Sequence, residues 1–133
     1  MKKRPEKLQD LSTAEWAVMK VLWEGGPMAT GEIYKRLARQ RQWAYSTVRT
    51  LVGRLVAKGW LRNRRVGNSF LYRAAVPRSR AVRSAISEFT GRVLDGVLSP
   101  FVAYYAEERG LTHEEVAQLE AIIKQHRSKP GEQ

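Results

Sequence analysis

The sequence predicts a mainly α-helical protein with one small β-hairpin: an N-terminal unit of three helices and the hairpin, followed by a region of further helices. Apolar residues recur at helical spacing along most of the 133 residues. A Gly-Asn pair separates two strand-like segments between residues 60 and 75. The charge is one-sided, because residues 1–76 hold 16 Lys and Arg against 5 Asp and Glu, whereas residues 77–133 hold 8 of each.

The first helix is predicted within the segment "LSTAEWAVMKVLWEGGP". Ser12 is the expected N-cap and Glu15 completes a capping box, while Leu11 and Trp16 stand at the positions of a hydrophobic staple. The Gly-Gly-Pro sequence at residues 25–27 ends the helix. The side expected to face the core holds Trp16, Met19, Leu22 and Trp23.

Two further helices follow. The second is expected from a cap at Thr30 to about Arg39, and the third from a cap at Ser46 to a C-terminal glycine, Gly59. Each has apolar residues three and four positions apart, which indicates one buried side. These residues are Ile33, Tyr34 and Leu37 on the second helix, and Val48, Leu51, Val52, Leu55 and Val56 on the third.

The opposite side of the third helix is small and cationic rather than mixed in charge. A side that only faces solvent favours Glu and Lys, whereas small residues beside Arg and Thr suit close approach to a nucleic-acid groove. This side is therefore the candidate recognition surface. It carries Ser46, Arg49, Thr50, Gly53, Arg54 and Ala57.

A basic hairpin is predicted next, because Gly67 and Asn68 tolerate the positive φ of a tight turn. A purely structural hairpin has no use for its four arginines, Arg62, Arg64, Arg65 and Arg73. Three helices followed at once by a hairpin is the order of a winged helix-turn-helix, in which the hairpin can lie along phosphates without reading bases. The net charge of +11 also favours a polyanion partner. Residues 1–76 are therefore predicted to be a winged-helix domain that binds double-stranded DNA.

Residues 77–127 are predicted to be a helical dimerisation region, and residues 128–133 a disordered tail. An apolar stripe from Val82 to Val97 has the narrow spacing of a helix-helix seam, and Ser99-Pro100 starts a new helix. Thr112 and Glu115 form a capping box for the last helix. So short a region encloses little core alone, and we expect a homodimer. The expected seam residues are Ile86, Phe89, Val93, Phe101 and Tyr105.

The composition weighs against catalysis, metal binding and membrane insertion. The chain has no cysteine, and its two histidines, His113 and His126, fall ~20 Å apart on one helix. We see no nucleophile–base pair and no phosphate-cradling glycine loop, so we expect neither an enzyme nor a cofactor. No apolar segment reaches the ~18 residues of a membrane span, and the N-terminus lacks the apolar part of a signal peptide. A cytoplasmic protein is expected.

The segments "LSTAEWAVMKVLW", "YSTVRTLVGRLVAKGWL" and "GNSFLYRA" resemble the penicillinase-repressor family, the BlaI/MecI/CopY group of bacterial transcriptional repressors. The resemblance spans about residues 8–126. It implies a homodimer whose winged helices bind a palindromic operator and whose C-terminal helices hold the subunits together. The positions that it implies for DNA contact are Ser46, Thr47, Arg49 and Thr50 at the start of the recognition helix, and Arg64, Arg65 and Asn68 in the wing.

The same resemblance bears on the inducing signal. In the β-lactam branch it implies cleavage of the repressor in the dimerisation region, prompted by a membrane sensor-protease. The cleaved Asn-Phe step falls here on Tyr104-Tyr105, where the family's Asn is absent. The copper branch uses a C-terminal cysteine cluster, which a chain without cysteine does not have.

Two alternative functions remain open at this stage. One is a winged-helix regulator of the multiple-antibiotic-resistance class, whose helical half binds a small molecule; a pocket lined by Trp or Tyr there would favour it. The other is an RNA-binding or ribosome-associated module that uses the same basic half.

Overall fold

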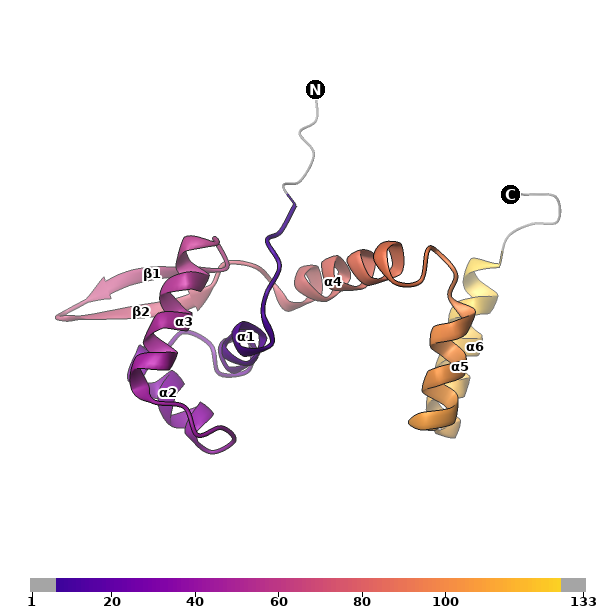
Figure 1. Ribbon diagram of the computed structural model, residues 1–133, viewed down its shortest axis with the longest axis horizontal. Coiled ribbons are helices and arrows are strands. Elements are labelled where there is room, and N and C mark those ends of the chain that lie inside the picture. Colours follow the sequence, from indigo (N-terminus) through magenta and orange to yellow (C-terminus); the bar gives the residue numbers. More distant parts are fainter. Residues whose placement is uncertain (1–6, 128–133) are drawn as a thin grey trace, which may run out of the picture. The chain divides into compact units, whose positions relative to one another are not determined.

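The computed structural model describes residues 7–127, which form six helices and one two-stranded antiparallel sheet. The predicted disordered tail at 128–133 lies outside the described residues. The chain divides into two compact units between Ser87 and Glu88, and each is described below by itself. The elements are α1 (Thr13–Gly25), α2 (Thr30–Ala38), α3 (Tyr45–Ala57), β1 (Leu61–Val66), β2 (Ser69–Ala74), α4 (Arg78–Arg92), α5 (Ser99–Glu108) and α6 (His113–His126) (Figure 1).

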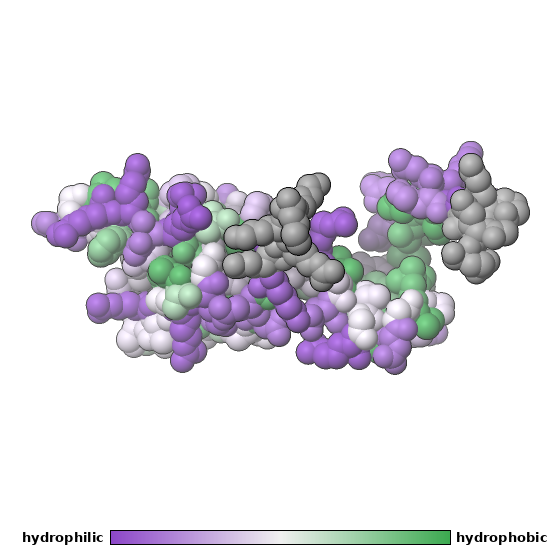
Figure 2. Space-filling view, turned by 90° about the horizontal axis from the view of Figure 1, so that it is seen from above, coloured by the Kyte–Doolittle hydropathy of each residue, from purple (hydrophilic) through white to green (hydrophobic). Residues whose placement is uncertain are grey.

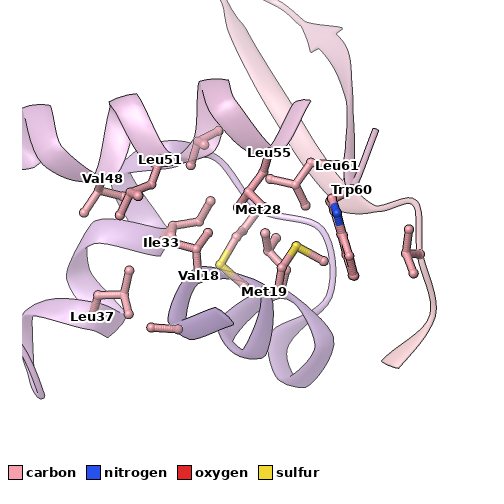
Figure 3. Packing of buried hydrophobic residues seen from close by; sticks show 14 of the residues in the cluster. Val18, Met19, Met28, Ile33, Leu37, Val48, Leu51, Leu55, Trp60 and Leu61 are labelled. Carbon is pink, nitrogen blue, oxygen red and sulfur yellow. The ribbon is translucent and has the colours of Figure 1, made fainter. Parts of the chain in front are cut away.

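The first unit packs α1, α2 and α3 around one apolar core, with the base of the hairpin beside it (Figure 3). Helices α2 and α3 bury the predicted Ile33 and Leu37, and Val48, Leu51, Val52 and Leu55. On α1 the predicted Met19 and Leu22 are buried, but Trp16 and Trp23 are only half-buried and Val18 lies in the core instead. Burial of a Leu or Ile side chain contributes about 1.5–3 kcal/mol. Trp60 and Leu61 extend the core into the hairpin, and Ala81 brings in the start of α4. The largest fully buried side chains are Met19, Ile33, Leu37, Leu55 and Leu61, with Val18, Val48 and Val52.

The predicted start of α1 is confirmed. Glu15 accepts a hydrogen bond from the Ser12 backbone N–H at 2.8 Å, and its own N–H donates to Ser12 Oγ at 3.1 Å. The helix ends before Gly26, whose φ of 78° lies in the region that favours glycine. Trp23 then donates its indole N–H to the Val76 carbonyl oxygen at 2.9 Å, which ties α1 to the chain after the hairpin.

The predicted caps of α2 and α3 are wrong. The N-caps are Ala29 and Ala44, and neither makes a side-chain capping bond. In place of the Ser46 cap, Tyr45 occupies the first turn of α3 and packs edge-on against Tyr34, with ring centroids 5.6 Å apart. Aromatic packing against α2 thus sets where α3 begins, and a local capping preference does not.

The predicted hairpin is confirmed, with six-residue strands in a register from Leu61↔Ala74 to Val66↔Ser69. Of the turn residues only Gly67 has a positive φ, 61°, so Asn68 does not need the left-handed region that the sequence suggested for both. A short bridge to Met28 extends the sheet: its N–H and C=O bond the Tyr72 backbone at 3.0 and 2.9 Å. The segment between α1 and α2 is thereby attached to β2.

In the second unit, the continuous apolar stripe predicted as far as Val97 is wrong. The helix α4 ends at Arg92, and the next residues turn through Asp95 and Gly96, with φ of 51° and 81°. These left-handed residues break the helix, so Val93 and Val97 lie outside it. The predicted capping box of α6 is confirmed, because Thr112 and Glu115 exchange hydrogen bonds of 3.1 Å.

Neither α5 nor α6 has a buried residue, in contrast to the helices of the first unit. Hydrophobic residues are accordingly visible on the surface of these two helices (Figure 2). None of the helices within residues 7–127 is long and apolar enough to cross a membrane.

Candidate nucleic-acid interface

The outward side of α3 is an exposed polar surface supported by a buried apolar one. Its inward residues Val48, Val52 and Leu55 are 0–2% exposed. The predicted contact residues all lie on the exposed side: Ser46, Thr47, Arg49, Thr50 and Arg54. Among the described residues, Arg49 and Arg54 make no ion pair or side-chain hydrogen bond, so their guanidinium groups are available to a ligand.

A partly buried ion pair lies at the other end of α3. Lys58, the C-cap, donates from Nζ to Glu15 Oε1 at 2.7 Å and to the Asp10 carbonyl oxygen at 3.0 Å. Glu15 is 2% exposed. Burial raises the pKa of its carboxyl, but the hydrogen bond and charge of Lys58, with the bonds from Ser12, outweigh it and hold that pKa below its usual value. Sequence reasoning found Glu15 only as a capping residue and missed Lys58.

A hollow of about 500 Å³ lies between the start of α2, the start of α3 and the hairpin. It brings together Arg49 and Asn68, two predicted contact residues that are 19 positions apart in the sequence. The first N–H groups of α2, at Thr30 and Gly31, also border it, and the N-cap offers them no side-chain acceptor. No Asp or Glu lines the hollow, so it presents donors and positive charge. Its lining residues are Ala29, Thr30, Gly31, Tyr45, Arg49, Asn68, Ser69, Phe70 and Tyr72.

The register of the hairpin separates the two arginines predicted for the wing. Arg65 pairs with Phe70, on the face that also holds the half-buried Tyr72. Arg64 pairs with Leu71, one residue along, and therefore faces the other way. Arg65 donates from Nε to the Gly67 carbonyl oxygen at 3.2 Å, which holds it near the turn. Arg64 and Arg65 are thus both exposed but do not form one site.

The net charge of the first unit, which holds the candidate interface, is larger than that of the whole chain. Residues 1–87 hold 19 Lys and Arg against 5 Asp and Glu, a net charge of +14, whereas residues 88–133 hold 5 against 8, a net charge of −3. Hydrophilic side chains project from the hairpin end of the first unit, with hydrophobic ones between them (Figure 2). Such a field attracts polyanions from a distance and raises their association rate.

The described residues contain no group of three or more His, Asp or Glu side chains placed to hold a metal ion. His113 and His126 begin and end α6, which agrees with the separation that the sequence predicted.

The comparisons with known proteins point to one family. The family model described as penicillinase repressor matches residues 11–125. The penicillinase repressor of Bacillus licheniformis is 30% identical over 127 residues, covering 96% of this chain and 99% of that protein. The methicillin resistance regulatory protein MecI of Mammaliicoccus sciuri is 28% identical, covering 88% of this chain and 95% of that protein.

Solved structures match as well, and one of them contains DNA. The solution structure of Bacillus licheniformis BlaI, in its monomeric form in complex with the blaP half-operator, has a TM-score of 0.50 at 34% identity. The match covers 56% of this chain and 90% of that one. The predicted combination of three helices and a hairpin is thus the winged-helix fold.

Proposed function

This chain belongs to the penicillinase repressor family of DNA-binding transcriptional repressors, and from that premise we propose which of its surfaces binds an operator. The side of α3 with Arg49 lies in the major groove. The hollow between α2, α3 and the hairpin receives the adjacent phosphate backbone. The observation that carries this assignment is the convergence of Arg49 and Asn68 on one hollow that no carboxylate lines. We place the protein in the cytoplasm, together with the operator DNA that it binds.

The division of labour follows from the positions of the side chains. Arg49 stands one helical turn from Tyr45, where a guanidinium can donate two bonds to a guanine edge. The backbone N–H groups at the start of α2 and the amide of Asn68 suit phosphate oxygens, which set the register of the protein on the duplex. Ser46, Thr47 and Thr50 contribute short hydroxyl contacts near the same groove.

The test is a titration of labelled duplex DNA from the region upstream of the protein's own gene, with a random duplex as competitor. We expect Arg49→Ala to weaken operator binding by ~1–3 kcal/mol and random binding much less. Arg109→Ala, at the C-cap of α5, is the matched control and leaves both affinities unchanged. Tighter binding to structured RNA than to any duplex would instead favour the RNA-binding alternative.

The second unit serves as the dimerisation region. The supporting observation is that its apolar residues lie exposed in one chain: Ile86 just before the unit is 58% exposed, and Val93 and Phe101 are 54% and 41%. Ring contacts link three of the predicted seam residues, since Phe101 lies 6.1 Å from Phe89 and 6.0 Å from Tyr105. A second copy would cover this surface, and two linked winged helices would read two half-sites ~10 base pairs apart or a multiple of that.

Phe89→Asp tests the dimer, because it places a charge in the seam. We expect a monomer in sedimentation and at least ~100-fold weaker operator binding at the same chain concentration. Lys124→Asp, on the exposed C-terminal turn of α6, also introduces an aspartate and serves as control. A monomeric Phe89→Asp variant that binds the operator fully would refute the role of the dimer.

A small-molecule regulator remains the second candidate, because α5 and α6 enclose an apolar groove that includes Tyr105 and Phe101. Its volume is about 230 Å³, below the ~300 Å³ at which drug-sized ligand pockets begin. A side chain of a second copy fits that space better than a ligand does. A hydrophobic ligand that releases DNA without dissociating the dimer would reverse this preference.

Relief of repression by cleavage of the Tyr104-Tyr105 bond is the third part of the proposal. Tyr104 is 60% exposed, which gives a protease access to its side chain. The bond lies inside α5, however, and exposed loops are cleaved more readily than helices. A membrane sensor-protease would therefore act on locally unwound α5. Mass spectrometry of the repressor after induction tests this cleavage. Recovery of only the full-length chain from cells in which repression has been relieved would contradict it.

A further inference from the structure

The first unit exposes few large apolar side chains, and they gather near the proposed DNA-binding surface. Before α4, the described residues hold three that are exposed: Tyr45 at the start of α3, and Val66 and Phe70 in the hairpin. Single apolar residues scattered over a surface need no explanation, but Tyr45 and Phe70 line the same hollow as Arg49. Phosphate oxygens in that hollow interact with donors and cations and do not need aromatic rings. The hollow therefore has an apolar part to which the proposed function assigns no ligand.

Tyr45 stands on α3 beside the residue that is proposed to read a base. Tyr45 and Arg49 are four positions apart, and side chains at that spacing lie on the same side of a helix. Tyr45 is 44% exposed, whereas Val48 on the inward side of the same helix is fully buried. A groove that receives Arg49 therefore also receives the ring of Tyr45. The expected cap at Ser46 placed Tyr45 outside the helix, so the sequence did not single it out.

The ring of Tyr45 is held in place without a ligand. It packs edge-on against Tyr34 of α2, with ring centroids 5.6 Å apart and ring planes inclined at 69°. Tyr34 is itself half-buried and packs against the core. The Tyr45 hydroxyl makes no hydrogen bond among the described residues, so ring packing alone positions the side chain. A side chain that is already positioned loses little conformational freedom on binding, and contact with it is correspondingly favourable.

A ring in this position matches one feature of the major groove. Among the four bases of DNA, only thymine projects a methyl group into that groove, and proteins recognise this group by apolar contact. The Arg49 guanidinium recognises the paired acceptors of a guanine edge and does not distinguish a methyl group from a hydrogen. Tyr45 and Arg49 are thus suited to different features of neighbouring base pairs, the ring to a methyl group and the guanidinium to acceptors.

We propose that Tyr45 is a further specificity-determining residue, which reads the 5-methyl group of a thymine near the guanine that Arg49 contacts. The inference rests on the proposed binding of α3 in the major groove and adds a second base to that reading. Four residues of α-helix rise about 6 Å, and neighbouring bases of one strand are about 3.4 Å apart. The thymine therefore lies within about two base pairs of that guanine.

Deoxyuridine isolates the contact, because it differs from thymidine only in lacking the 5-methyl group. The duplex is the operator upstream of the protein's own gene, and each thymine of one half-site is replaced in turn by deoxyuridine. The affinity of the full wild-type chain for each duplex is measured by fluorescence anisotropy at one salt concentration. The guanine read by Arg49 is the one whose replacement weakens wild type but not Arg49→Ala. One deoxyuridine within about two base pairs of it should weaken binding about fourfold, equivalent to the ~0.8 kcal/mol of one buried methyl group.

Variants then show which side chain senses the methyl group. Tyr45→Ala should bind the thymine and deoxyuridine duplexes equally at that position, whereas Tyr45→Phe keeps the ring and should keep the fourfold difference. Phe70→Ala is the matched control, since it removes the other exposed ring of the hollow and should also keep the difference. A difference that persists in Tyr45→Ala overturns the proposal. Its loss in Tyr45→Phe also overturns it, because the hydroxyl and not the ring would then be responsible.

A second variant removes the ring if Tyr45→Ala disturbs the start of α3. Tyr45 is the first residue of α3, a position that proline favours, and Ala44 before it has the extended φ of −72° and ψ of 157° that suit a residue preceding proline. Tyr45→Pro should therefore preserve the helix, which circular dichroism checks, and abolish the methyl effect. Absence of any duplex binding by wild type would refute the proposed function itself. Wild-type binding that no deoxyuridine near the Arg49 guanine weakens refutes only this inference, and that measurement needs no variant of Tyr45.

Discussion

Replacement of Lys58 by Met should loosen the recognition helix through the carboxylate that it leaves behind. In the native protein Lys58 Nζ lies 2.7 Å from Glu15 Oε1, with side chains 27% and 3% exposed. The variant keeps the length and apolar stem of the side chain but removes its charge. Glu15 then retains only its bonds with Ser12.

The expected loss is about 2 kcal/mol of unfolding free energy at pH 7. Breaking a fully buried ion pair costs about 3–5 kcal/mol. The partial exposure of Lys58 lets water reach the carboxylate, and the Ser12 N–H continues to donate to it, which lowers the cost toward the ~1–3 kcal/mol of an unsatisfied buried group. Loss of the bond to the Asp10 carbonyl oxygen adds to the same total.

Urea unfolding followed by tryptophan fluorescence measures this loss. All four tryptophans, Trp16, Trp23, Trp43 and Trp60, lie in the first unit, so their emission reports that unit alone. Lys35→Met, which removes an exposed lysine of α2, is the matched control and should change stability by less than ~0.5 kcal/mol. Equal chain concentrations keep any dimerisation contribution constant.

The pH dependence gives the sharper check. The folded pKa of Glu15 lies below the unfolded value, so its stabilisation is present above the unfolded pKa of about 4.3 and is lost as the pH falls through the folded pKa. Without Lys58, burial opposes ionisation and the folded pKa rises. The difference between wild type and Lys58→Met should therefore shrink between pH 7 and pH 4. A difference that stays constant over this range would refute the electrostatic explanation and leave only lost packing.

Three further predictions follow from other contacts. Trp23→Phe removes the indole bond to the Val76 carbonyl oxygen and should cost about 1 kcal/mol in the same urea assay; no loss would mean that water replaces the bond. Gly67→Ala forces a side chain into φ 61° and should destabilise the hairpin by about 1 kcal/mol, measured by hydrogen exchange of β1 and β2, with unaltered exchange arguing against strain. Thr112→Ala removes the capping bond of α6 and should lower the helical circular-dichroism signal of a C-terminal fragment. A weaker dimer with an unchanged helical signal would contradict the capping role and show that Thr112 stabilises the dimer instead.

Much of the first unit could be predicted from the sequence because its signals are local. The capping box at Ser12 satisfies helix N–H groups within four residues, so no distant contact is needed to recognise it, and the same holds for the box at Thr112 in the second unit. The hairpin follows from the Gly67-Asn68 pair between two strand-like segments, although only Gly67 takes a positive φ. The one-sided charge is a property of composition, and it indicated a polyanion partner before any geometry was known.

Features that depend on contacts between elements, or on the conformation of single residues, could not be predicted from the sequence. α3 begins at Tyr45, whose ring packs on Tyr34 of α2, and α4 ends at Arg92, shortly before the left-handed Asp95 and Gly96. The expected dimerisation residues and the boundary between residues 76 and 77 stay predictions, since one chain shows exposed apolar residues but not what covers them.

The sequence by itself determined which side chains carry the chemistry, because amphipathic spacing and charge are written in the order of residues. Only the tertiary structure decided which of them act together. The fold brings Arg49 and Asn68 to one hollow, places Arg64 with Arg73 beside another, and joins Lys58 to Glu15 across 43 positions. Such contacts arise where three helices and two strands pack around a shared core, and no single element's periodicity encodes them.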